Sequence, residues 1–152
     1  MKRILSVFAI TLLSFAAMAE HHNEEHADLY AAIQAFDYAY ATNDTETYFD
    51  YYTDDATVFY GGARQDLAAY AKSWPEFMEA GGGVEKNVMS DLKVQVLPCG
   101  DVAVVTAFID NVTRSPDGSK ESIRAFETDV WQKVDGKWKV VSLHYTELPA
   151  EE

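Results

Sequence analysis

The stretch that decides the fold is residues 127–146, ETDVWQKVDGKWKVVSLHYT. Its β-branched and aromatic residues predict two strands, and Asp135-Gly136 between them is a preferred sequence for a two-residue hairpin turn. Pro- and Gly-containing turn signals separate further strands upstream. The strands expected in this half of the chain are residues 85–97, 101–113, 121–134 and 137–147. Long strands joined by short turns predict an antiparallel meander.

The chain before this meander predicts helices. Apolar residues recur at three- and four-residue spacing from Asp28, until Asn43-Asp44 interrupts the pattern, and Asp44 is suited to cap the next helix. Helices are expected from residue 28, at 45–52 and at 65–79, with a short strand at 56–60. Pro75 is expected to kink or split the third helix. Helices followed by a curved antiparallel sheet define an α+β fold.

Both faces of the expected strand 101–113 are largely apolar. One face carries Val104 and Phe108, and the other carries Val105 and Ile109. Helices can cover one face only, and a chain of this length has little left to cover the other. A homodimer that packs sheet against sheet is therefore expected.

The N-terminus has the three parts of a secretory signal peptide. Lys2 and Arg3 precede an apolar run, and Ala17-Met18-Ala19 supplies small residues before a cleavage site. The expected organisation is a signal peptide at 1–19, a flexible polar segment at 20–27, a domain at 28–148 and an acidic tail at 149–152. Export across the inner membrane, to the periplasm, follows from this prediction, and no membrane association is expected after cleavage.

The charge of the chain narrows the choice of partners. The formal net charge is −13, so binding to nucleic acid or to anionic lipid surfaces is disfavoured.

The single cysteine, Cys99, excludes an internal disulfide. His21, His22, Glu25 and His26 could hold a metal, but the segment is interpreted as a solvated tail. No cofactor and no metal site are predicted.

The chain resembles the nuclear transport factor 2-like superfamily, also called SnoaL-like. The resemblance rests on Tyr52-Thr53-Asp54-Asp55-Ala56-Thr57-Val58 and on residues 127–146, which are similar to the association domain of calcium/calmodulin-dependent kinases and its bacterial relatives. It implies a cone-shaped, cystatin-like fold, in which a curved antiparallel sheet wraps three N-terminal helices and leaves a pocket. The superfamily includes isomerases, cyclases and dehydratases as well as non-catalytic binding and assembly proteins, so the fold alone does not assign an activity.

A residue-by-residue comparison with the steroid isomerases of this superfamily argues against their mechanism. Their general base falls on Tyr60, and their oxyanion-stabilising tyrosine falls on Phe36. Tyrosine is a poor base at neutral pH, and phenylalanine donates no hydrogen bond. Isomerase chemistry by that route is therefore not expected.

Three polar residues on the expected strands are candidates for the site. His144 is the one histidine of the expected domain and could act as acid, base or hydrogen-bond donor, or could be structural. Asp110 interrupts an apolar strand, and Arg124 on the next strand is its plausible partner. If the pair faces the pocket, Arg124 would bind an anionic ligand group and Asp110 would be a base; otherwise the pair is structural. Glu127 lies on the opposite strand face from Arg124, so only one of the two should face the pocket.

Abundant aromatic residues suit a pocket for a flat organic molecule, although they also suit a core. The candidate ligand-binding aromatics are Tyr40, Tyr52, Phe59, Trp74 and Trp131. The leading hypothesis is an exported protein that binds a small apolar or aromatic molecule in its pocket. The alternatives are a lyase, isomerase or hydrolase that uses His144 and Asp110 as acid–base groups, or a non-catalytic assembly domain with a filled pocket.

Overall fold

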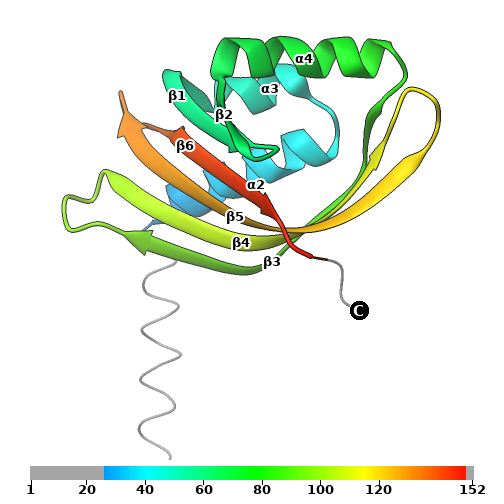
Figure 1. Ribbon diagram of the computed structural model, residues 1–152. Coiled ribbons are helices and arrows are strands. Elements are labelled where there is room, and N and C mark those ends of the chain that lie inside the picture. The colour runs from blue at the N-terminus through cyan, green and yellow to red at the C-terminus, as the bar shows by residue number, and fades with distance from the viewer. Residues whose placement is uncertain (1–25, 150–152) are drawn as a thin grey trace, which may run out of the picture. The chain divides into compact units, whose positions relative to one another are not determined.

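The computed structural model describes residues 26–149 (Figure 1). The chain divides into two compact units, Met1–Gln34 and Ala35–Glu152. Helix α2, Ala27–Ala41, begins in the first unit and ends in the second, and every other element belongs to the second. The expected signal peptide and most of the two flanking polar segments lie outside the described residues. Within residues 26–149, no helix has the length and apolar character needed to cross a membrane.

Two short helices follow α2, and side-chain caps begin both. Helix α3 is Thr45–Asp50, where Oδ1 of Asp44 accepts a hydrogen bond from the Thr47 backbone N–H at 3.1 Å, as the cap prediction requires. Helix α4 is Leu67–Glu79, capped in the same way by Asp66. Pro75 lies inside α4, which runs unbroken from Leu67 to Glu79, so the proline does not split the helix. The Trp74 and Phe77 rings, on either side of Pro75 in the chain, contact each other edge-on with centroids 5.6 Å apart.

The second unit is built on one six-stranded sheet with the order β2-β1-β6-β5-β4-β3. Its strands are β1 Tyr52–Tyr60, β2 Ala63–Asp66, β3 Gly83–Val96, β4 Val102–Arg114, β5 Lys120–Val134 and β6 Lys137–Glu147. Strands β3 to β6 form the expected antiparallel meander. The sheet as a whole is mixed, however, because β1 runs parallel to β6.

The β1–β2 hairpin is the part of the sheet that the sequence did not predict. Strand β1 begins at Tyr52, where a helix was expected, and β2 occupies the expected start of the third helix. Gly61 and Gly62 have φ values of 62° and 76°, a left-handed conformation that glycine adopts without strain. These two glycines fold β2 back onto β1, so the strand pairing overrides the local helical pattern.

The fold class is confirmed as α+β, with a curved, unclosed sheet, helices α2 and α3 before β1, and helix α4 between β2 and β3 (Figure 1). In the second unit, Trp131 of β5 is fully buried and meets the Phe36 ring edge-on, with centroids 5.4 Å apart. Asn43, with φ at 61°, exchanges two hydrogen bonds with the Val84 backbone, of 2.7 and 2.9 Å. This pairing fixes the end of α2 against β3, where the polar part of the site is formed.

Candidate functional site

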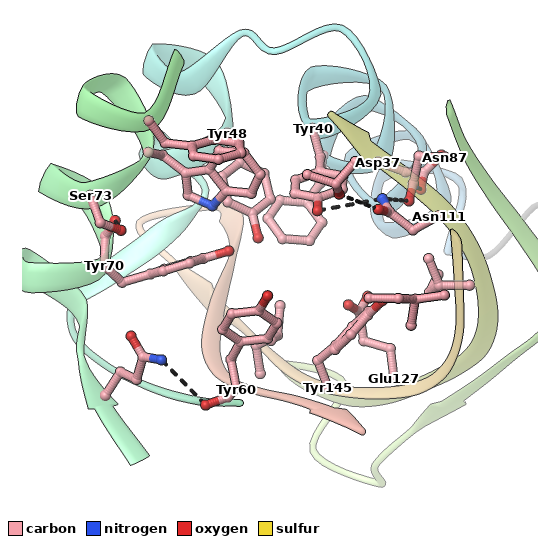
Figure 2. Close-up of a pocket in the computed structure, with 18 of the residues that line it drawn as sticks. Asp37, Tyr40, Tyr48, Tyr60, Tyr70, Ser73, Asn87, Asn111, Glu127 and Tyr145 are labelled. Atoms are coloured by element: carbon pink, nitrogen blue, oxygen red, sulfur yellow. Dashed lines mark hydrogen bonds between the residues drawn. The ribbon is translucent and has the colours of Figure 1, made fainter. Parts of the chain in front are cut away.

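A cavity of about 630 Å³ lies between the helices of the second unit and the sheet (Figure 2). Its aromatic lining comes from α2, α3, α4, β1 and β6. These aromatic residues are Phe36, Tyr40, Tyr48, Tyr60, Tyr70, Trp74, Phe77 and Tyr145. Cavities of this size and character hold drug-sized organic molecules in other proteins.

Ring-to-ring contacts hold the aromatic lining in place. Tyr40 of α2 meets Tyr48 at a centroid distance of 5.4 Å and meets Trp74 edge-on at 5.5 Å. Residues 70, 74 and 77 follow the three- and four-residue spacing that places side chains on one helix face. The Tyr48 hydroxyl also lies 2.7 Å from the Tyr52 hydroxyl, behind the lining. These contacts between aromatic side chains therefore fix the shape of the cavity wall.

One wall of the cavity is a chain of polar side chains from α2, β3 and β4 (Figure 2). Asn87 Nδ2 donates to Asp37 Oδ1 at 2.7 Å, and Asn111 Nδ2 donates to Asn87 Oδ1 at 3.1 Å. The Thr113 hydroxyl donates to Asn111 Oδ1 at 2.7 Å. Asn111 is only 4 % exposed, so these hydrogen bonds satisfy a buried amide. Each amide is thereby oriented by its neighbours, as a recognition site for polar ligand groups requires.

Glu127 of β5 is the carboxylate that faces the cavity without a partner (Figure 2). Within residues 26–149, it makes no hydrogen bond or ion pair. Burial, and secondarily the charge of Asp37, raise the pKa of Glu127 from 4.5 to about 7. Burial also raises the pKa of Asp37, against the lowering effect of its hydrogen bond from Asn87. Glu127 can therefore accept or release a proton near neutral pH.

Asp129 lies two residues along β5 from Glu127 and is buried behind the cavity. Burial, followed by the charge of Glu127, raises its pKa well above the ordinary range. Its Oδ1 has no hydrogen-bond partner among the residues that the structure describes. Burial of a carboxyl whose Oδ1 has no partner favours its neutral form, and Asp37 and Glu127 are the acids of the inner wall that face the cavity.

Of the predicted ligand-binding aromatics, Tyr40 and Trp74 line the cavity. Tyr52 and Trp131 are buried in the core instead, so their predicted contact with a ligand is corrected to a supporting role. Phe59 meets His144 with ring centroids 4.6 Å apart, away from the cavity. These three positions satisfied the aromatic pattern, which does not distinguish core from pocket.

The predicted catalytic and anion-binding residues lie on the opposite face of the sheet. His144 is exposed and pairs with the Thr146 hydroxyl at 3.0 Å. Arg124 forms an ion pair with Asp110, with N–O distances of 2.8 and 2.9 Å, and its guanidinium lies 5.0 Å from the centre of the Phe108 ring. Neither Asp110 nor Arg124 lines the cavity, so the pair does not face the pocket.

Strand alternation explains this correction. Ile109 and Asn111 line the cavity, so Asp110 between them points away. Leu143 and Tyr145 likewise place His144 on the far face. The roles proposed for His144, Asp110 and Arg124 assumed that these side chains face the pocket, and that assumption was wrong.

The residues that sequence reasoning missed are Asp37, Asn87, Asn111 and, as an inward-facing acid, Glu127. A signal was present, because the strand face that carries Asn111 also carries Ala103 and Ala107, whose small side chains leave room beneath helices. The isomerase positions Phe36 and Tyr60 do line the cavity. Burial raises the pKa of Tyr60, which makes it a still poorer base. Within residues 26–149, no three His, Cys, Asp or Glu side chains gather to hold a metal ion.

The mixed sheet, the helices beside it and the cavity between them form a fold that solved structures of NTF2-like proteins share. A family model for the SnoaL-like domain matches residues 29–151, and the chain belongs to that family. A comparison with curated protein sequences finds no match.

Solved structures share the fold at low sequence identity. A protein provisionally assigned as a calcium/calmodulin dependent protein kinase II association domain, from Xanthomonas campestris, is 21% identical with a TM-score of 0.65, covering 81% of this chain and 87% of its own. A provisionally assigned scytalone dehydratase from Novosphingobium aromaticivorans is 17% identical with a TM-score of 0.70, covering 86% and 89%. A ketosteroid isomerase-like protein from Erwinia carotovora atroseptica is 20% identical with a TM-score of 0.67, covering 84% and 98%.

Proposed function

We propose that this protein binds a small organic molecule with an apolar or aromatic body in the cavity between its helices and its sheet. The observation that carries the proposal is the cavity of about 630 Å³, lined by eight aromatic side chains and one polar wall. Apolar surfaces supply affinity in such sites, and a few fixed polar groups orient the ligand. The oriented chain Asp37–Asn87–Asn111 supplies those polar groups.

A probe and a blocked cavity test this proposal. Naphthaleneethanol, a neutral aromatic molecule, should bind saturably in isothermal titration calorimetry. Ser73→Trp places a large ring in the cavity lining and should abolish binding, whereas Glu79→Trp, an exposed position on the same helix outside the lining, should not. Equal binding by both variants would place the probe elsewhere and would contradict the proposal.

Acid–base catalysis is the second candidate function, and Glu127 is the residue that favours it. It faces the cavity unpartnered, with its pKa raised to about 7, which suits a general acid or base at neutral pH. The structural resemblance to a provisionally assigned dehydratase supports a search among such reactions. An enzyme of this kind should lose turnover in Glu127→Gln even at saturating substrate concentration. Turnover that survives this substitution would exclude Glu127 as the catalytic residue.

An assembly role without a ligand has weaker support. That hypothesis expected a pocket filled by Trp74, Phe77 and Trp131. Trp74 and Phe77 instead line a cavity of about 630 Å³, and Trp131 is fully buried and does not line it.

A further inference from the structure

We propose that the occupant of the cavity is an organic cation: a protonated amine or a quaternary ammonium group attached to an apolar or aromatic body. This proposal rests on the function proposed above, because it names the chemical class of ligand for the same cavity. It follows from the charges of the lining, from the aromatic rings beside them, and from the absence of a basic side chain among the lining residues.

The lining carries negative charge that the protein itself leaves uncompensated. It includes three carboxylates, those of Asp37, Glu76 and Glu127, and no Lys, Arg or His. Glu76 is paired with Lys72 at 3.7 Å, and both side chains are exposed. Asp37 accepts a hydrogen bond from a neutral amide only, and Glu127 has no partner within the described chain. Two carboxylates thus share the inner wall without a countercharge, which is costly in a partly desolvated site.

Aromatic rings stand next to these carboxylates. Figure 2 shows Tyr145 beside Glu127. The centroids of the Tyr145 and Tyr60 rings are 5.7 Å apart. Tyr40 is close enough to Glu127 for that charge to raise its pKa, after the larger effect of burial. A cation near Glu127 would therefore also lie beside electron-rich rings. Aromatic rings combined with a carboxylate form the environment that recognises ammonium groups.

Ligands of other charge fit the cavity less well. An anion would approach two carboxylates with no basic residue in the lining to receive it. A neutral molecule would fill the aromatic part but would leave Asp37 and Glu127 in mutual repulsion, or Glu127 protonated. The formal net charge of −13 also attracts cations and repels anions over the whole surface.

Three probes with the same aromatic body isolate the effect of charge. Naphthaleneethylamine is cationic, naphthaleneethanol is neutral and naphthaleneacetate is anionic. Isothermal titration calorimetry at about pH 8 compares the dissociation constants of the three probes. Glu127, whose pKa is raised to about 7, is mostly ionised at that pH. We expect the amine to bind at least about tenfold more tightly than either of the others. A quaternary analogue, naphthylmethyl trimethylammonium, should share the preference because the rings contribute to it.

A matched pair of variants assigns the preference to the cavity. Glu127→Gln should reduce the advantage of the amine over the alcohol to below about threefold. Glu79→Gln, which removes an exposed carboxylate outside the lining, should retain the full advantage. If Glu127→Gln fails to fold, shown by loss of a cooperative melt, the comparison of probes on the unmodified protein decides the question.

The outcomes separate this proposal from the function on which it rests. Equal or tighter binding of the alcohol or the acetate would overturn the cation proposal and leave the binding function standing. Failure of all probes to bind would overturn both. An amine preference that Glu127→Gln leaves unchanged would also overturn it, because the proposal places the cation beside Glu127.

Discussion

Replacing Glu127 with glutamine should make the stability of this protein less dependent on pH. The glutamine side chain has nearly the same shape but does not ionise, so the substitution removes the titration and keeps the packing. Because Glu127 faces a cavity and has no partner among the described residues, little else should change. Comparison of Glu127→Gln with the unmodified protein therefore measures the free-energy cost of keeping the Glu127 carboxylate ionised in the cavity wall.

The sign and size of the effect follow from the raised pKa. Glu127 titrates at about 7 in the folded protein and near 4.5 when it is unperturbed. The folded state therefore binds this proton more tightly than the unfolded state does. The contribution of Glu127 to the free energy of unfolding is greatest below about pH 4.5 and is lost as the pH rises through about 7. The pKa difference corresponds to about 3 kcal/mol, and screening by water in the cavity reduces the expected loss to about 2 kcal/mol.

Urea denaturation, followed by circular dichroism at several pH values between about 5 and 8, tests this expectation. The free energy of unfolding of the unmodified protein should fall relative to Glu127→Gln by about 2 kcal/mol over that range. Glu79→Gln should track the unmodified protein, because Glu79 is exposed. Parallel curves for the unmodified protein and Glu127→Gln would refute the reasoning, since they would mean that Glu127 is as well solvated in the fold as in the unfolded chain.

Three further predictions concern other parts of the chain. Tyr48→Phe should lower the free energy of unfolding by about 1–2 kcal/mol in urea titrations, because it leaves the buried Tyr52 hydroxyl without its 2.7 Å partner. We propose that a second copy covers the outer sheet face, where Phe126 (36% exposed) contacts Phe108 and Val88 is 43% exposed. Light scattering should then report a dimer, and Phe126→Glu a monomer; a monomeric unmodified protein would contradict this. We also propose export with cleavage after Ala19, so N-terminal sequencing of periplasmic protein should begin at Glu20; an intact N-terminus would refute it.

The meander was predictable because its signals are local. Asp135-Gly136 and the two upstream turns mark the strand ends, and β3 to β6 match the expected boundaries within two residues. The parallel pairing of β1 with β6 was not predictable in the same way, because it joins residues far apart in the chain. Strand β2 was missed for a related reason: it exists through its pairing with β1, while its own sequence resembles the start of a helix.

The site was harder to predict than the fold because it depends on which sheet face the helices cover. The two faces of β4 are both largely apolar, so the alternation of side chains does not indicate whether Asp110 or Asn111 faces the helices. Asp110 was favoured as a charged residue in an apolar strand, and its register with Arg124 satisfied the expectation of a partner. Asp110 lies outside the cavity in its ion pair with Arg124, whereas Glu127 lines the cavity and pairs with no described residue.

The parallel contact between β1 and β6 also has a consequence for the order in which the chain folds. Strand β6 inserts between β1 and β5, so the β1–β2 hairpin joins the sheet only through the last strand to be synthesised. Until residues such as His144 and Leu143 have arrived, Phe59 and Val58 have no neighbour on that side. Such long-range pairing slows folding. The two halves of the cavity wall therefore form together and late, and a chain that ends before β6 would lack the site as a whole.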